Sequence, residues 1–267
     1  MTEMGAIPPE PPFVRLTGVG LRFSLLTDGP PLLRQAIVRR VLARPLRRLR
    51  RSEDLWALSD VSLAVEHGER VGVIGDNGAG KSTLMAVIAG IYPPTAGRVQ
   101  VAGRVAPLTH LGAGFNGELS ARENVILYGA LLGHDRRRME ERVDGILRFA
   151  GVRRFARMPV KYFSTGMALR LGFAVATDIL PEILLIDEVF AGGDTAFRRR
   201  AGRRMRELVG TAKILVMVSH NLELVRELCS RVVLLEHGRV VADGAPAAVI
   251  DAYLAREEAA DDLPESL

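Results

Sequence analysis

The stretch Gly75-Asp76-Asn77-Gly78-Ala79-Gly80-Lys81-Ser82-Thr83 decides how this chain folds. It follows the apolar run 70–74 and leads into the apolar run 84–88. This order predicts a strand, a glycine-rich loop and a helix in succession. In that setting, the pattern G-x-x-x-x-G-K-[ST] is typical of a loop that binds phosphate.

The residue types in this loop suit a polyphosphate. Glycines let the chain curl around an anion with its N–H groups aimed inward, and the following helix adds its positive end. Lys81 would then reach the β- and γ-phosphates, and the Ser82 hydroxyl would hold Mg²⁺. The alternative, a glycine-rich turn with a solvated lysine, is disfavoured. The chain has only three lysines among its 36 basic residues, and one of them stands at the motif position.

Length and composition narrow the remaining possibilities. The 267 residues suffice for one substantial α/β core with a subdomain. The one cysteine, Cys229, excludes an internal disulfide and suits a reducing compartment. No run approaches the ~18–20 apolar residues that span a bilayer, and the proline-rich stretch 1–12, an expected disordered leader, lacks the features of a signal peptide. We therefore expect a cytosolic protein unless a partner holds it elsewhere.

The positive charge of the chain is concentrated in one segment. Residues 30–51 hold eight arginines and no acid, so without them the net charge changes from +5 to −3. Apolar residues recur there at three- and four-residue spacing, which predicts an amphipathic basic helical insertion over about 30–52, interrupted at Pro45. Contact with a membrane surface, docking of an acidic partner and a solvated helical face are all compatible with this pattern. We favour a position near the membrane.

Hydrophobic patterning divides the rest of the chain into strands and helices. Strands are predicted at 13–26, 57–66, 69–74, 97–102, 105–108, 183–186, 213–218, 231–235 and 239–242. Helices are predicted after the phosphate loop and around 197–208 and 222–229. A helical insert is expected between about 110 and 170, with Ser120-Ala121-Arg122-Glu123 as a capping box. The acidic residues 256–267 are expected to form a loose tail.

Two further strands end in chemically useful side chains. The buried run 183–186 ends in Asp187 and Glu188, and the run 213–218 is followed by His220. Ligands of an open parallel sheet bind at the carboxyl ends of its strands. Asp187 would hold Mg²⁺ or its water, and Glu188 could polarise an attacking water. Each of these residues alone could be an ordinary surface group, but their combination favours hydrolysis.

A third motif lies directly before a predicted helix. Ser164-Thr165-Gly166 presents a hydroxyl, a bare backbone and a positive helix end, all of which suit an anion. A plain helix N-cap is the alternative. Nothing in the sequence obliges this motif to face the phosphate loop of its own chain.

In this order, the motifs resemble the ATP-binding subunit of ABC transporters. Finer features resemble the subfamily that exports lipid-linked polysaccharides such as O-antigen, capsule and teichoic acid; they are Leu111-Gly112-Ala113-Gly114-Phe115 and the stretches 122–124, 163–167 and 186–194. The resemblance implies an ABC ATPase domain over 13–255, with its helical subdomain at about 110–170. The implied fold class is α/β, a P-loop NTPase (RecA-like) core with a small antiparallel β subdomain and a helical subdomain.

The resemblance also implies partners and residue roles. Such subunits form head-to-tail homodimers that hold two ATP molecules and Mg²⁺ between them. Ser164 and Gly166 would contact the γ-phosphate held by the other subunit, with Asp194 at the dimer seam. His220 would contact the γ-phosphate in the same subunit, and an aromatic side chain would stack on adenine. Phe23 is the best match for that aromatic residue and Trp56 the alternative.

The chain departs from the general family pattern in a few places. Thr165 and Met167 replace a glycine and a glutamine of the common signature, as in the export subfamily. No glutamine follows Gln100, so the loop glutamine that senses Mg²⁺ is missing, and His110, Leu111 or Asn116 stands roughly there. Some relatives carry a carbohydrate-binding domain after this core, and we expect none in the few residues that follow 253.

The predicted function is therefore ATP hydrolysis coupled to export. The expected partners are a second copy of the chain, an integral-membrane permease and a lipid-linked glycan as cargo, at the cytoplasmic face of the membrane. The alternatives are an ABC-type ATPase acting on nucleic acid or the ribosome, and an exporter of lipid or drug. The chain has neither the long coiled-coil insertions nor the second ATPase core that the former usually carry, so no nucleic-acid partner is expected.

Overall fold

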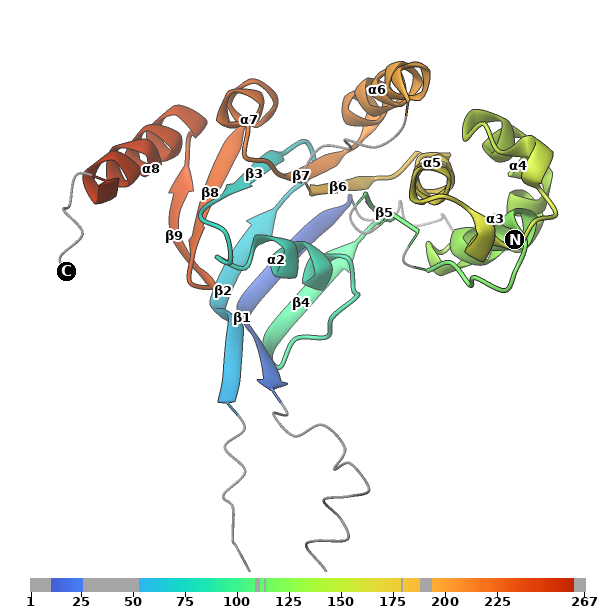
Figure 1. Cartoon of the computed structure of the whole chain (residues 1–267). Coiled ribbons are helices and arrows are strands. Elements are labelled where there is room, and N and C mark those ends of the chain that lie inside the picture. The colour runs from blue at the N-terminus through green and yellow to red at the C-terminus, as the bar shows by residue number, and fades with distance from the viewer. Residues whose placement is uncertain are drawn as a thin grey trace, which may run out of the picture.

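The phosphate loop directly follows an inner strand of a six-stranded sheet (Figure 1). The computed structural model describes residues 11–25, 53–108, 111–112, 114–178, 180–187 and 194–261, so the segment 30–52, His110 and Glu188 lie outside the described residues. The strands follow the order β5 (Val105–Pro107), β6 (Ile183–Asp187), β7 (Ile214–Val218), β3 (Arg70–Ile74), β8 (Arg231–Glu236) and β9 (Arg239–Gly244). All neighbours pair in parallel except β8 and β9, which are antiparallel.

The central strands are continuous apolar runs because both of their faces are covered. All five residues of β7 and the first four of β6 are buried. Parallel sheets with helices on their faces require such runs. The strands predicted at 183–186, 213–218, 231–235 and 239–242 are confirmed, with the β8–β9 turn at 237–238.

A three-stranded antiparallel sheet lies on one side of the larger one (Figure 1). Its order is β2 (Glu53–Val65), β1 (Phe13–Leu25) and β4 (Ala96–Ala102). Helix α2 (Lys81–Ile88) packs between the two sheets, where Leu84 and Met85 are fully buried in one cluster with Leu58 of β2 and Val73 of β3. Both sheets therefore fix the helix that follows the phosphate loop.

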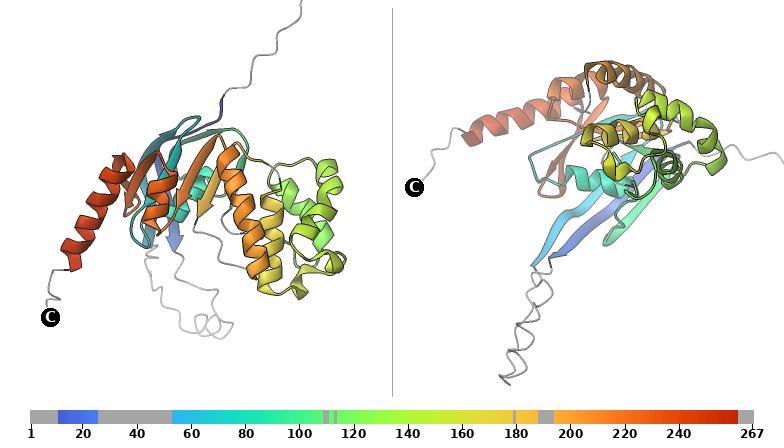
Figure 2. Two further views of the ribbon diagram at one scale, coloured as in Figure 1. Left: turned by 90° about the horizontal axis from the view of Figure 1, so that it is seen from above. Right: turned by 45° about the vertical axis from the view of Figure 1, so that its right-hand side comes forward.

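Three helices between β5 and β6 form a lobe beside the sheet (Figures 1 and 2). They are α3 (Ala121–Leu131), α4 (Arg136–Phe149) and α5 (Thr165–Ala176), and the short 3-10 turns Arg153–Phe155 and Val160–Tyr162 connect the last two. The predicted capping box is present, since Ser120 accepts a hydrogen bond from the Glu123 N–H and the Glu123 carboxylate accepts one from the Ser120 N–H. Buried residues of all three helices, among them Val125, Met139 and Leu171, join the main core.

The opposite face of the larger sheet is covered by α6 (Thr195–Thr211), α7 (Leu222–Leu228) and α8 (Pro246–Asp261) (Figure 1). Here the expectation of a loose tail from 256 is wrong up to Asp261, because α8 continues to that residue. The stretch 255–260 consists of good helix formers, and Arg256 pairs with Glu236 of β8 at 2.6 Å. Within the described ranges, every helix is too short or too polar to cross a lipid bilayer.

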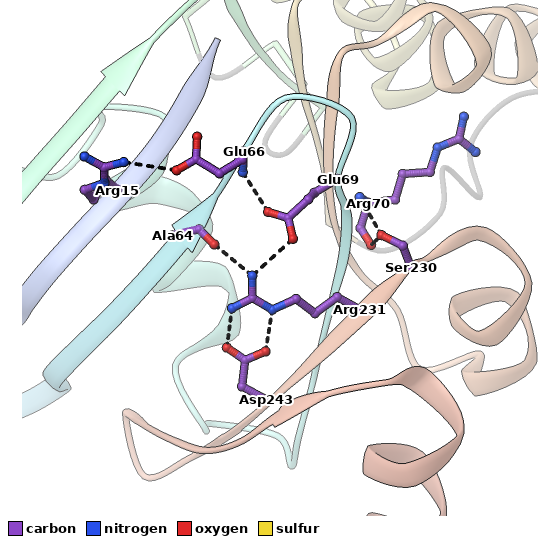
Figure 3. Close-up of polar contacts among 8 residues, drawn as sticks. All are labelled: Arg15, Ala64, Glu66, Glu69, Arg70, Ser230, Arg231 and Asp243. Atoms are coloured by element: carbon purple, nitrogen blue, oxygen red, sulfur yellow. Dashed lines mark hydrogen bonds and ion pairs between the residues drawn. The ribbon is translucent and has the colours of Figure 1, made fainter. Parts of the chain in front are cut away.

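Arg231 joins the two sheets at the end of β3 that lies away from the phosphate loop (Figure 3). Its guanidinium makes two hydrogen bonds of 2.5 Å to Asp243 on β9. It also donates to the Ala64 carbonyl of β2 at 3.0 Å and to the Glu69 carboxylate at 3.2 Å. The hydrogen bonds to Asp243 raise the pKa of Arg231, with a smaller contribution from Glu69, so the guanidinium stays charged.

Replacing this guanidinium should destabilise the fold. We expect Arg231→Met to lower the free energy of unfolding by about 2 kcal/mol, because Asp243 and the Ala64 carbonyl lose these hydrogen bonds and Glu69 keeps only its bond from the Glu66 N–H. The matched control is Arg136→Met, which removes an exposed ion pair within α4 and should cost below about 0.5 kcal/mol. Urea unfolding followed by circular dichroism measures both variants. Equal losses would contradict a special role for Arg231.

Candidate functional site

The register of three neighbouring strands brings the predicted site residues together. Val73 of β3 pairs with Val218 of β7, and Val218 pairs with Asp187 of β6. The phosphate loop begins two residues after Val73, and His220 comes two residues after Val218. All of these groups therefore lie at the carboxyl ends of adjacent parallel strands, where such sheets bind ligands.

The phosphate loop needs glycine at three positions. Gly75, Gly78 and Gly80 have φ values of +136°, +84° and +104°, which L-residues rarely adopt. A Cβ at Gly75 would lie 2.1 Å from the Leu235 carbonyl oxygen of β8, and one at Gly80 would lie 2.6 Å from the Ala57 carbonyl oxygen of β2. The loop therefore passes between β2 and β8, whose backbone oxygens leave no room for a side chain at Gly80 or Gly75.

Lys81 is held over this loop. It is the first residue of α2 and is buried, and its ammonium donates to the carbonyls of Gly75 at 2.6 Å and Asp76 at 2.8 Å. The N-cap of α2 is Gly80, which offers no side chain to the first N–H groups of the helix. These N–H groups and the ammonium make the start of α2 an anion-binding position.

A cavity of about 580 Å³ opens over the loop. The predicted residues that line it are Phe23, Trp56, Asn77, Gly78, Gly80, Lys81, Ser82, Thr83, Asp187 and His220. Leu55, Ala57 and Val218 complete the lining and were not predicted from the sequence. Residues from five separate stretches of the chain thus converge on one space. Gly75, Asp76 and Ala79 belong to the loop but are not among the lining residues.

Both aromatic candidates for stacking lie at this cavity. Arg22 and Phe23 of β1 pair with Trp56 and Leu55 of β2, so the Phe23 and Trp56 side chains start from opposite faces of the sheet, and both residues nevertheless line the cavity. Phe23 packs edge-to-face on Tyr92, with ring centroids 5.6 Å apart. Trp56 is 47% exposed and its ring faces the Arg22 guanidinium at 5.7 Å. Because both rings line the same cavity, the choice between Phe23 and Trp56 stays open.

The cavity offers an oxygen donor set that fits Mg²⁺. The Ser82 hydroxyl and the Asp187 carboxylate come from different elements and line the same space. Among the described residues there is no group of three or more His, Cys, Asp or Glu side chains that could hold a metal alone. Such a sparse set suits Mg²⁺, which is commonly bound by one or two protein oxygens together with phosphate oxygens.

Ser164, Gly166 and Asp194 do not line this cavity. Ser164 is the exposed N-cap of α5, and its hydroxyl accepts a hydrogen bond of 3.3 Å from the Met167 N–H. Asp194 caps α6 in the same way through the Phe197 N–H at 2.8 Å. The hydrogen bond from Phe197 lowers the pKa of Asp194, and the nearby Arg170 guanidinium contributes less. The capping roles of Ser164 and Asp194 are thus present in the single chain.

An ion pair links these two caps. Arg170 of α5 bonds to the Asp194 carboxylate at 2.7 Å. Helix α5 and the N-terminus of α6 are therefore tied to each other by two residues that do not line the cavity of the same chain.

A buried amide holds residues 116–119, in the loop after β5 where a family glutamine is missing. The Asn124 side chain accepts from the Asn116 N–H at 2.8 Å and donates to the carbonyls of Asn116 and Leu119, each at 2.9 Å. The Asn116 side chain accepts from the Glu118 N–H at 3.0 Å, and Leu111 packs against the core. Of the three candidate replacements, Asn116 and Leu111 thus have structural roles here, and neither lines the cavity.

These features define a P-loop nucleotide-binding domain, and comparison with known proteins gives the family. Residues 58–191 match the family model described as ABC transporter. The chain belongs to the ABC transporter family and is an ABC ATPase.

Individual relatives extend the match. The chain is 44% identical over 197 residues to the ABC transporter protein AbcA of Aeromonas salmonicida, covering 74% of this chain and 64% of AbcA. It is 37% identical over 237 residues to the O-antigen export system ATP-binding protein RfbB of Klebsiella pneumoniae, covering 87% and 96%. It is 38% identical over 201 residues to the teichoic acids export ATP-binding protein TagH of Lactococcus lactis, covering 75% and 43%. The chain thus spans less than two thirds of AbcA and TagH.

A solved structure agrees with the fold. The structure described as an ATP binding subunit of an ABC transporter has a TM-score of 0.63 at 24% identity, covering 90% of this chain and 93% of that chain. The family resemblance and the fold class inferred from the sequence are confirmed.

Two contacts of the phosphate loop carried no signal in the sequence. The Gly238 N–H in the β8–β9 turn donates to the Ala79 carbonyl at 2.9 Å. The Tyr253 hydroxyl on α8 lies 3.0 Å from the Asp76 carboxylate. Both partners are more than a hundred residues away in the chain, and neither has a motif of its own.

The lack of room around the loop can be tested with two glycines of similar conformation. A Cβ at Gly78 would meet no atom within 4 Å, whereas one at Gly80 would meet the Ala57 carbonyl. We expect Gly78→Ala to cost about 1 kcal/mol of folding free energy from its left-handed backbone alone. Gly80→Ala should cost about 3 kcal/mol, because strain and overlap with backbone add. Urea unfolding without nucleotide measures both, and an equal cost would argue against this lack of room.

Proposed function

We propose that this chain is the ATP-hydrolysing subunit of an ABC transporter that exports a lipid-linked polysaccharide across the cytoplasmic membrane. The observation that carries the ATPase part is the convergence of Lys81, Ser82, Asp187 and His220 on one cavity over the phosphate loop. The cargo is inferred from relatives named for export of O-antigen and teichoic acids. An exporter of lipid or drug is the nearest alternative.

The geometry supports a definite placement of ATP. Residues 75–83 would hold the phosphates, with Lys81 on the β- and γ-phosphates and the adenine against Phe23 or Trp56. Ser82 and Asp187 would hold Mg²⁺, which supplies charge neutralisation at the phosphate oxygens when bound.

Hydrolysis then needs a water in line with the γ-phosphate. Glu188, the residue after Asp187, is proposed to orient and polarise that water. His220 at the end of β7 would contact the γ-phosphate and stabilise charge that develops on it. The work of this site is positioning and electrostatic stabilisation.

The second half of the site is proposed to come from another copy of the chain. Ser164 and Gly166 lie at the N-terminus of α5 and do not line the cavity of their own subunit. In a head-to-tail homodimer, they would contact the γ-phosphate held by the partner, with Asp194 at the seam. The positive end of α5 supports this, because a helix N-terminus attracts phosphate.

The remaining partners follow from the transport role. The subunit would dock on an integral-membrane permease at the cytoplasmic face of the membrane. The arginine segment 30–52 is proposed to contact the membrane surface through anionic headgroups. No nucleic-acid partner is proposed.

Two substitutions should separate ATP binding from hydrolysis. Glu188→Gln should leave ATP affinity nearly unchanged and reduce turnover by a factor of about 10² to 10⁴, because the water loses its base. Lys81→Ala should weaken ATP binding itself by roughly tenfold or more, because a charge-assisted contact is lost. Titration with labelled ATP and a phosphate-release assay measure the two effects. Unchanged hydrolysis in Glu188→Gln would overturn the assignment of the base.

Export can be tested in the cell that makes the protein. Deleting the gene should abolish the surface polysaccharide and leave lipid-linked glycan inside. Wild-type protein should restore export, whereas Glu188→Gln at equal abundance should not. Staining of surface glycan and extraction of the lipid-linked form measure the outcome. Normal surface polysaccharide in the deletion strain would refute the cargo, and salt-sensitive binding of the purified protein to DNA or RNA would favour a role on nucleic acid.

A further inference from the structure

A tyrosine on the last described helix contacts the phosphate loop. The Tyr253 hydroxyl lies 3.0 Å from Oδ1 of Asp76 in the loop and 2.7 Å from Oε1 of Glu257, one turn further along α8. Asp76 and Tyr253 are 177 residues apart in the chain. The contact therefore joins the nucleotide site to α8 by a single side chain.

The Tyr253 hydroxyl can donate a hydrogen bond to only one of these carboxylates at a time. A phenol has one proton to donate, and two ionised carboxylates can only accept. Burial raises the pKa of Tyr253, and both carboxylates raise it further, so the hydroxyl keeps its proton. The hydrogen bonds to Asp76 and Glu257 therefore compete with each other.

Asp76 places a negative charge inside a loop that must accept a polyphosphate. Its carbonyl faces the Lys81 ammonium at 2.8 Å, while its carboxylate reaches outward to Tyr253 and is not part of the cavity lining. A hydrogen bond from a neutral phenol stabilises the carboxylate in that outward position. Without the bond, the carboxylate is free to turn toward the incoming phosphates and repel them.

Helix α8 is a firm support for this contact. Ile250 is fully buried, and Arg226 of α7 pairs with Asp251 at 2.8 Å. Arg256 pairs with Glu236 of β8 at 2.6 Å. The Tyr253 ring itself packs against the main core. The hydroxyl is therefore held in place relative to the sheet from which the loop emerges.

We propose that Tyr253 is a positioning residue of the nucleotide site, whose hydroxyl holds the Asp76 carboxylate outside the phosphate cradle. Glu257 is the competing acceptor, to which the hydroxyl donates when its hydrogen bond to Asp76 breaks. The inference rests on the proposed binding of ATP at residues 75–83, and it is independent of the exported cargo.

A double-mutant cycle tests this directly. Mg-ATP affinity is titrated for the full chain and for Tyr253→Phe, Asp76→Asn and the double variant, all under conditions without turnover. Tyr253→Phe should weaken binding by about five- to tenfold, the equivalent of one typical intramolecular hydrogen bond. In the Asp76→Asn background, the same substitution should change affinity by less than about twofold, because no carboxylate is left to restrain. Asp76→Asn alone should bind Mg-ATP more tightly than the wild type, because the loop loses a negative charge.

The matched control breaks a different anchor of α8. Arg256→Met removes the pair with Glu236, but buried Ile250 and the Arg226–Asp251 pair still hold α8 in this variant, so it should lower the melting temperature without changing affinity. An equal loss of Mg-ATP affinity from Tyr253→Phe in both backgrounds would show that Tyr253 acts through packing of α8. No loss of affinity would show that the contact with Asp76 does not affect ATP binding. Either result would overturn the inference while leaving ATP binding intact. Failure of the wild type to bind ATP would instead refute the proposed function as well.

Discussion

Parallel pairing of β7 with both β3 and β6 is the constraint on which the site depends. The pairs Val73–Val218 and Val218–Asp187 set the three strands level at their carboxyl ends. A slip of one residue in either pair would turn every side chain of a buried strand to the opposite face and force the close-packed core to repack. The hydrophobic burial of these strands therefore also fixes where Asp187 and His220 stand relative to Lys81.

The shape of the phosphate loop depends on the strands around it as well as on its own glycines. Backbone oxygens of Ala57 on β2 and Leu235 on β8 leave no room for a Cβ at Gly80 and Gly75. The Gly238 N–H, in the turn after β8, bonds to the loop at the Ala79 carbonyl. A loop confined in this way is already ordered before the nucleotide arrives, so binding pays less conformational entropy. Both sheets thus take part in forming a site that the motif alone seems to define.

How far the sequence predicted the site follows from where each signal lies. Lys81, Asp187 and His220 were found because a local pattern, a glycine motif or the end of an apolar run, marks each of them. The choice between Phe23 and Trp56 could not be made, because both residues line the same cavity. Tyr253 was missed because its partner Asp76 is remote in sequence and no periodicity reports the contact. The helical course of α8 beyond Arg256 was missed because acidic composition was weighed above the helix propensity of 255–260.

The arrangement of contacts also suggests how a two-chain site can open without losing its nucleotide cradle. The cradle is anchored to β2, β8 and, through Tyr253, to α8. Asp194 is instead paired with Arg170 of α5, the helix that Ser164 caps. A movement that carries the N-termini of α5 and α6 toward or away from a partner would therefore move both proposed seam residues together. Because this ion pair is separate from the contacts of the loop, the proposed homodimer can separate at Asp194 while the phosphate loop keeps its shape, as a cycle of ATP binding and release would require.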